Sequence, residues 1–201
     1  MNKKFSLVLS ASLKPAFSLL GMHLAMLIFS SLVYNTVYTY AGTGNAVWGI
    51  LLGVVFIAGH ISITVVSLNQ QAEKDFKKRK NNERYIDIGE KVSDRDLAKE
   101  TVPYKGFLVG LLSEIPGVIL IFAAGIFSSE SLTLWVKLLY SPYSMLLDSL
   151  FGNDFSVWLY MTAVLVTVLI AALRYKKVTE YLVKEEIDMI NEIKELSGED
   201  E

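Results

Sequence analysis

Four apolar stretches, each long enough to cross a lipid bilayer, constrain this chain more than any other feature. A membrane-spanning helix needs roughly 17–25 mostly apolar residues. The stretches of this kind cover about residues 15–38, 47–68, 106–127 and 155–173. Because backbone amides in hydrocarbon must hydrogen-bond within their own segment, we expect each stretch to be a helix. The sequence thus predicts an all-α integral membrane protein with four transmembrane helices, forming one membrane domain over residues 1–201.

The composition excludes several other classes of protein. Charged residues make up 20% of the chain and lie in blocks between the apolar stretches, which is not the pattern of a soluble enzyme or a disordered chain. The chain has no cysteine, so it has neither a disulfide framework nor a cysteine nucleophile. Its net charge of −2 gives no electrostatic reason to expect a nucleic-acid partner. It also lacks the glycine-rich Walker motif of an ATPase and the His-Glu-x-x-His motif of a metalloprotease.

The basic residues predict the orientation of the helices. Residues 1–14 hold three lysines, residues 69–105 hold ten basic residues and residues 174–201 hold five, whereas the other two connections hold only Lys137. Because basic residues gather in cytoplasmic loops, we expect a protein of the cytoplasmic membrane with both termini in the cytoplasm. The aromatic residues expected to form a belt at the outer interface are Tyr34, Tyr38, Tyr40, Trp48, Trp135, Tyr140, Tyr143, Trp158 and Tyr160.

The connections and tails carry further predictions. Residues 1–14 are expected to lie in the cytoplasmic interface as an uncleaved segment, interrupted at Lys14-Pro15. In the charged cytoplasmic linker 69–105, Ser93 followed by Asp96 indicates a capped short helix. Apolar residues at helical spacing in the outer loop 128–154 are typical of amphipathic segments that lie in the plane of the interface, which is the preferred interpretation. The alternatives are that this loop caps the bundle or docks a partner.

The acidic tail 174–201 is expected to continue the fourth helix into the cytoplasm. An apolar stripe on such a helix must be buried against the linker of the same chain, a second copy or another protein. We expect a cytoplasmic partner to bind at Tyr181–Leu196. The stripe consists of Val178, Leu182, Met189, Ile193 and Leu196.

Three titratable residues lie inside the predicted spans at one depth. Glu114 and His23 lie nine residues past Lys105 and Lys14, and His60 lies nine residues before Asn69. At 1.5 Å per residue, all three are ~13 Å from the cytoplasmic boundary. Thr167 brings the fourth helix near the same level. Titratable groups at this depth are costly, commonly face the interior of a bundle and are functional candidates.

Small residues indicate how these helices face one another. Glycines spaced four residues apart mark surfaces where helix backbones approach closely, and they share stripes with His60 and Glu114. Pro116 leaves a carbonyl of its helix without a hydrogen-bond donor, so we expect a kink beside Glu114. The expected packing glycines are Gly49 and Gly53 in the second span, and Gly106, Gly110 and Gly117 in the third.

This cluster is compatible with several kinds of chemistry. His23, His60 and Glu114 are suitable ligands for a divalent metal ion such as zinc, and we predict no other cofactor beyond this ion. They could instead relay protons, or the two histidines could ligate a haem. A Glu–His hydrogen bond can also simply hold helices together.

The preferred interpretation from sequence is a non-enzymatic multi-pass membrane subunit, which assembles with itself or with a larger membrane complex of the transport type. The alternative is a small oligomeric transporter or channel that uses the Glu/His cluster for protons or a divalent metal ion. A membrane-embedded enzyme comes third. In each case the bilayer is the primary environment, and the expected protein partner is another copy or another membrane protein.

Overall fold

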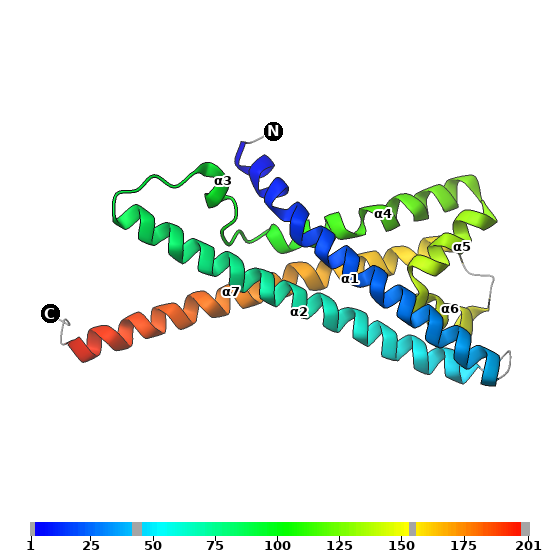
Figure 1. Ribbon diagram of the computed structural model, residues 1–201. Coiled ribbons are helices and arrows are strands. Elements are labelled where there is room, and N and C mark those ends of the chain that lie inside the picture. The colour runs from blue at the N-terminus through cyan, green and yellow to red at the C-terminus, as the bar shows by residue number, and fades with distance from the viewer. Residues whose placement is uncertain (1–2, 42–45, 153–155, 198–201) are drawn as a thin grey trace.

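The computed structural model describes residues 3–41, 46–152 and 156–197, which form helices and the turns between them (Figure 1). The elements are α1 (Lys3–Ala41), α2 (Ala46–Asp87), α3 (Asp94–Leu97), α4 (Lys105–Phe127), α5 (Glu130–Leu139), α6 (Ser141–Phe151), the 3-10 turn η1 (Val157–Tyr160) and α7 (Met161–Ser197). These described ranges contain no strand. The predicted all-helical class is confirmed, and the four helices α1, α2, α4 and η1–α7 are long and apolar enough to cross a membrane.

Most of the apolar surface of these helices faces outward. Only 22% to 44% of the most apolar window of each helix is buried within the protein. Soluble proteins rarely expose apolar patches larger than a few hundred Å², whereas lipid acyl chains solvate such side chains. The chain is therefore a multi-pass membrane protein. Large apolar side chains that are more than half exposed include Phe29, Leu32, Val55, Ile119, Ile126, Leu165 and Leu169.

Three of the helices are longer than a bilayer is thick. At 1.5 Å per residue, α1, α2 and α7 each extend over more than ~50 Å, against ~30 Å of hydrocarbon. Beyond Leu68 helix α2 continues to Asp87, and beyond Leu173 helix α7 continues to Ser197. The continuation of the fourth helix is thereby confirmed. The first turn of α1, the end of α2 and the last turn of α7 lie at one end of the bundle (Figure 1), which we call the lysine-rich end.

The tail packs against the linker, and the linker also packs against the first helix. Ser93 accepts a hydrogen bond from the amide of Asp96 and caps α3, as the sequence predicts. Glu186 on α7 pairs with Lys80 on α2 at 3.0 Å. The tail therefore contacts the linker of its own chain. The side chains of Ile193 and Leu196 lie outside the described residues.

Pro15 does not interrupt the first helix. Helix α1 runs continuously from Lys3 through Pro15 to Ala41, so residues 3–14 are its first turns and not a separate segment. Proline removes only one backbone hydrogen bond from a helix, and packing offsets that loss. Val8 is fully buried against Ala98 and Leu108.

The outer loop folds into a helical hairpin that enters the bundle. Helices α5 and α6 run antiparallel beside α4 and α2, and the turn between them points toward the centre of the protein (Figure 1). Tyr140, Ser141, Ser144 and Met145, at this turn, are buried. The expectation that the loop lies flat in the interface is therefore wrong for its central part.

Hydroxyl groups explain why this turn is stable inside the protein. Buried polar groups need hydrogen-bond partners, most of all where water is scarce. The Ser141 hydroxyl lies 2.6 Å from that of Ser30 on α1. The Ser144 hydroxyl lies 2.7 Å from that of Tyr160. The hairpin is thereby joined to α1 and to η1, which directly precedes α7.

The expected aromatic belt stays a prediction, and two of its members do not fit it. Trp48, Trp135 and Trp158 are exposed, which suits a membrane interface. Tyr140 and Tyr160, however, belong to the apolar core between α4, α5 and α7. Both hydroxyls have partners inside the bundle, so these residues are core components. The side chains of Tyr34, Tyr38 and Tyr40, and residue Phe155 at the expected start of the fourth span, lie outside the described part.

Candidate functional site

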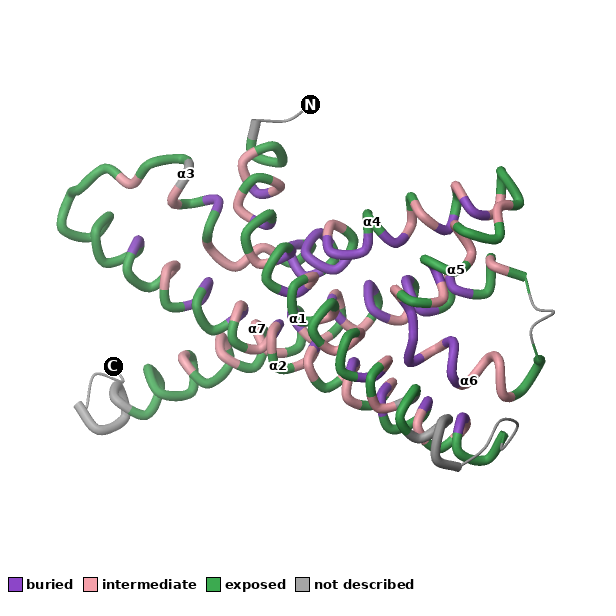
Figure 2. Tube along the Cα trace, turned by 45° about the vertical axis from the view of Figure 1, so that its right-hand side comes forward, coloured by how far each residue is buried: buried purple, intermediate pink, exposed green. Residues whose placement is uncertain are grey.

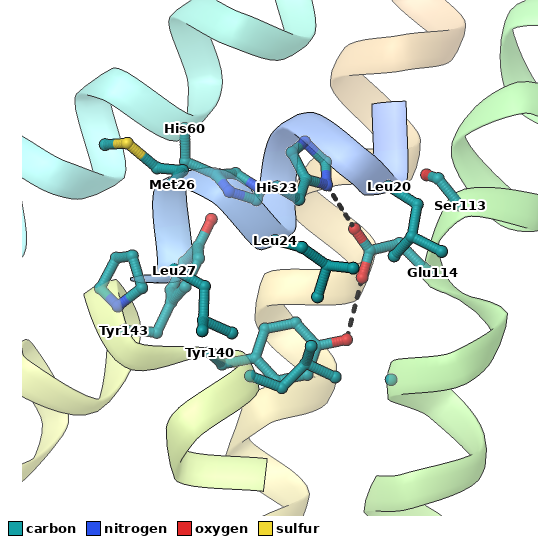
Figure 3. Close-up of a pocket in the computed structure, with 13 residues that line it drawn as sticks. Leu20, His23, Leu24, Met26, Leu27, His60, Ser113, Glu114, Tyr140 and Tyr143 are labelled. Atoms are coloured by element: carbon teal, nitrogen blue, oxygen red, sulfur yellow. Dashed lines mark hydrogen bonds and ion pairs between the residues drawn. The ribbon is translucent and has the colours of Figure 1, made fainter. Parts of the chain in front are cut away.

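The three titratable residues predicted at one depth converge in the structure. His23 of α1, His60 of α2 and Glu114 of α4 each offer one ligand atom, and these atoms all lie within 4.8 Å of one another (Figure 3). The side chain of His23 is 9% exposed and that of Glu114 is 5% exposed. The site is therefore a buried cluster formed by three separate helices.

Two threonines orient the histidine rings. The Thr64 hydroxyl donates its one hydrogen to the carbonyl of His60 at 3.0 Å, so it accepts the hydrogen bond from Nε2 of His23 at 3.1 Å. In the same way, the Thr167 hydroxyl donates to the carbonyl of Ala163 and accepts from Nε2 of His60 at 3.2 Å. In the neutral form of each ring, Nε2 therefore carries the hydrogen and Nδ1 is an unprotonated ligand atom.

Glu114 completes the cluster through its two carboxylate oxygens. Its Oε2 accepts a hydrogen bond from the hydroxyl of Tyr140 at 2.9 Å, and its Oε1 lies 3.5 Å from Nδ1 of His23 (Figure 3). The hydroxyl of Tyr140 comes from the turn of the α5–α6 hairpin. Tyr143 from the same hairpin places its ring edge-on to His60, with 5.9 Å between the ring centroids.

The pair formed by His23 and Glu114 needs a cation. With Nε2 protonated, Nδ1 presents a lone pair to a carboxylate oxygen, and two acceptors at 3.5 Å repel each other. A proton between them removes this repulsion, and so does a metal ion bound to both. Ligand atoms at the ~2.0–2.2 Å bond lengths of tetrahedral zinc are separated by about 3.3 Å. The observed separation is close to this value.

The space beside the cluster suits a small ligand. A cavity of about 20 Å³ adjoins His23, His60 and Glu114, and its other walls include Leu24, Met26 and Leu27. This volume is enough for one water molecule or ion. The two histidine rings stack with centroids 4.0 Å apart, so no porphyrin fits between them and the haem interpretation is wrong for this arrangement.

The expected packing glycines lie where other elements approach. A Cβ on Gly53 would come within 2.9 Å of the backbone nitrogen of Leu146, and one on Gly49 would collide with Ser149. Both neighbours belong to α6. The second span therefore packs its glycine stripe against the re-entrant hairpin.

The glycines of α4 face two other elements. A Cβ on Gly106 or Gly110 would press on α7, at 2.8 Å from the Cβ of Ala171 in the case of Gly110. One on Gly117 would overlap the hydroxyl of Tyr140, so the absence of a side chain there admits the phenol to Glu114. Pro116 lies within a continuous α4, and the kink stays a prediction.

Sequence reasoning missed several members of this site. Thr64 lies four residues after His60, so its place on the same helical stripe was a usable signal. Tyr140 and Tyr143 carried no such signal because aromatic residues near the end of a span are typical of an interfacial belt. Only the re-entrant path of the hairpin brings them to the cluster.

A second buried network was also missed. Lys105 is 1% exposed and its Nζ lies 2.8 Å from Oδ2 of Asp75, which also accepts from the hydroxyl of Tyr175 at 2.7 Å. This network joins α2, α4 and α7 at the lysine-rich end. From the sequence, Asp75 and Lys105 were both expected to belong to a solvated linker.

Comparisons of this chain with protein-family models, with curated proteins and with solved structures found no match. Its function is therefore inferred from the residues of the site.

Proposed function

We propose that this chain is a membrane transporter whose His23–His60–Glu114 cluster binds a divalent metal ion and releases a proton when it does so. The observation that carries the proposal is the 3.5 Å separation of Nδ1 of His23 and Oε1 of Glu114, two acceptors that require a cation between them. Two imidazoles and a carboxylate are a ligand set of catalytic zinc sites, and they leave a fourth position open.

The surroundings of the ligands support metal binding. Metal-bound histidines usually donate their other ring N–H to a fixed acceptor, and ligating carboxylates are hydrogen-bonded in turn. Thr64 and Thr167 provide the acceptors for the histidines, and Tyr140 is the donor for Glu114. A metal ion that takes the place of the proton between His23 and Glu114 would displace it, which couples the two ions at one site.

Transport requires further copies or partners. Four helices with a cavity of about 20 Å³ do not enclose a pathway, so the proposal includes assembly into an oligomer. It also places the lysine-rich end and both termini in the cytoplasm, because 18 of the 19 basic residues lie on that side of the four crossings.

The test combines binding and flux. Purified protein should bind Zn²⁺, with proton release measured by calorimetry in buffers of different ionisation enthalpy, and should carry Zn²⁺ into proteoliposomes. Glu114→Gln should weaken binding by more than about 100-fold, beyond the effect expected of an outer-shell partner, and abolish flux. The control is Glu185→Gln, an exposed carboxylate on the α7 extension. Binding and flux unchanged in Glu114→Gln would refute the proposal.

A second candidate is the non-enzymatic subunit of a larger membrane complex. It is favoured by the α7 extension, where Tyr181, Ile187 and Met189 are more than half exposed beyond the expected span. In this case Glu114→Gln and His60→Ala would leave every activity intact, and deletion of residues 181–201 would release the chain from a complex isolated in mild detergent.

A further inference from the structure

A large basic cavity lies at the lysine-rich end, apart from the metal cluster. It has a volume of about 600 Å³ and lies between the first turns of α1, the extension of α2 and the connection from α3 to α4. Its polar lining includes five lysines against a single aspartate, and its apolar lining includes Leu7, Ala11 and Pro15. The charged residues are Lys14, Lys74, Lys78, Lys99, Lys105 and Asp75.

The two carboxylates that pair with lysines of this cavity do not neutralise it. The carboxylate of Asp75 is used by Lys105 at 2.8 Å. Asp96, outside the lining, is shared by Lys78 at 3.4 Å and Lys99 at 2.9 Å. The hydroxyl of Ser93 and the neighbouring Lys99 hold the pKa of Asp96 well below its usual range, so this one charge serves two lysines.

Lys14 and Lys74 supply the remaining positive charge. Neither has an ion-pair partner among the residues that the structure describes, and both side chains are exposed. Lys14 is on α1 and Lys74 is on α2, so the two ammonium groups approach the cavity from different helices. An anion that enters it would meet these groups without displacing an existing pair.

The position of the cavity selects the kind of anion. Lys14 directly precedes the first predicted span, and Lys74 follows the end of the second by less than two turns, so both lie where lipid headgroups meet the hydrocarbon. On the same face of α1, one turn from Lys14, the ring of Phe17 is 67% exposed. A phosphate at the lysines would therefore leave an attached acyl chain free to lie along apolar side chains of α1. Basic pockets between helices at this level suit anionic phospholipids.

We propose that this cavity binds the phosphate of an anionic phospholipid headgroup, held by Lys14 and Lys74. Free inorganic phosphate would offer the lysines the same chemical group. The apolar side chains of α1 beside the lysines favour a lipid as its source. The inference is independent of the proposed metal transport.

The test uses the full chain in detergent and three probes: phosphatidylglycerol, phosphatidylcholine and inorganic phosphate. Native mass spectrometry should detect one tightly retained phosphatidylglycerol and no equivalent phosphatidylcholine, and millimolar inorganic phosphate should not displace it. The double variant Lys14→Gln/Lys74→Gln should lose affinity for phosphatidylglycerol by about 30-fold, as expected for two lysines near an anionic headgroup.

The matched control is Lys176→Gln/Lys177→Gln. These two exposed lysines lie near the same level on α7 but do not line the cavity. Equal retention of both lipids, an equal loss in the control, or displacement by inorganic phosphate would each overturn the assignment to a lipid. Zn²⁺ binding measured on the same variants should be unchanged, so failure of this inference is distinct from failure of the proposed transport.

Discussion

Each histidine of the cluster donates from Nε2 to a threonine whose own hydrogen is already used along its helix. The consequence is that Nδ1 of His23 faces Glu114 as an acceptor. The sequence places Thr64 one turn from His60 and Thr167 at the same depth, so residue spacing alone predicts part of this site. Which nitrogen faces the carboxylate depends on where each hydroxyl hydrogen points, and residue spacing carries no information on that.

Tyr140→Phe tests the role of the hydroxyl that contacts Glu114. This variant keeps the ring in the core but removes the hydrogen bond to Oε2. Because outer-shell partners of metal ligands affect affinity by 10–100-fold, we expect Zn²⁺ binding to weaken by about that factor. Titration of purified protein with Zn²⁺ measures it, and Tyr181→Phe on the exposed tail is the control. Wild-type affinity in Tyr140→Phe would show that this hydroxyl does not support a metal site.

Helices in this protein pack so closely at certain glycines that a single added methyl group would collide with the neighbouring element. Helix α2 rests on the re-entrant α6, and α4 rests on α7, in both cases over glycines. The spacing of the glycines predicts a close contact. It does not identify the neighbour, and for α2 that neighbour is a hairpin expected to lie in the interface. The α5–α6 hairpin is therefore part of the core at its end of the bundle, and Figure 2 shows buried segments at the turn between these helices.

Gly53→Ala and Gly21→Ala form a matched pair of substitutions. A methyl group on Gly53 presses on the α6 backbone, whereas one on Gly21 meets nothing within 4 Å. Overpacking typically costs 1–3 kcal/mol, so we expect Gly53→Ala to lower the free energy of unfolding by about that amount. Gly21→Ala should raise it by about 0.5–1 kcal/mol, since alanine favours helix. Unfolding in detergent monitored by circular dichroism compares them, and equal stability would contradict the described approach of α6.

The pair of Asp75 and Lys105 ties the linker to α4. Loss of one partner from a buried ion pair typically costs 3–5 kcal/mol, because the other charge is left buried. We expect Asp75→Asn to lower the free energy of unfolding by about 3–5 kcal/mol, and Asp75→Leu/Lys105→Met to restore most of it. Glu73→Gln, an exposed neighbour on α2, is the control. If Asp75→Asn is as stable as this control, the pair contributes little to stability.

Charged residues are distributed very unevenly over the whole molecule. Basic residues and the extensions of α2 and α7 are gathered at one end, while the hairpin and the exposed tryptophans Trp48, Trp135 and Trp158 belong to the other (Figures 1 and 2). The extensions are largely exposed beyond the bundle, as the green parts of α2 and α7 in Figure 2 show. The proposed cytoplasmic location of the lysine-rich end depends on this distribution, because basic residues gather on the cytoplasmic side of membrane proteins.

Labelling of single cysteines tests the orientation, since the chain has none of its own. A membrane-impermeant maleimide applied to intact cells should label Ser156→Cys, at the hairpin end, and not Glu185→Cys on the α7 extension. Permeabilised cells should show both labels, which controls for reactivity. Labelling of Glu185→Cys alone in intact cells would reverse the orientation and place the lysine-rich end outside.

Hydrophobicity and helical rise are local properties, so the four apolar helices, the continuation of α7 and the common depth of His23, His60 and Glu114 could be predicted from residue order alone. The entry of Tyr140 into the bundle and the burial of Asp75 with Lys105 could not, because each depends on contacts between segments far apart in the chain. A tyrosine near the end of a span, or a charge in a linker, has the same local sequence whether it meets solvent or a partner. The packing of the hairpin against α2, and of the linker against α4, determined that Tyr140, Asp75 and Lys105 meet buried partners and not solvent.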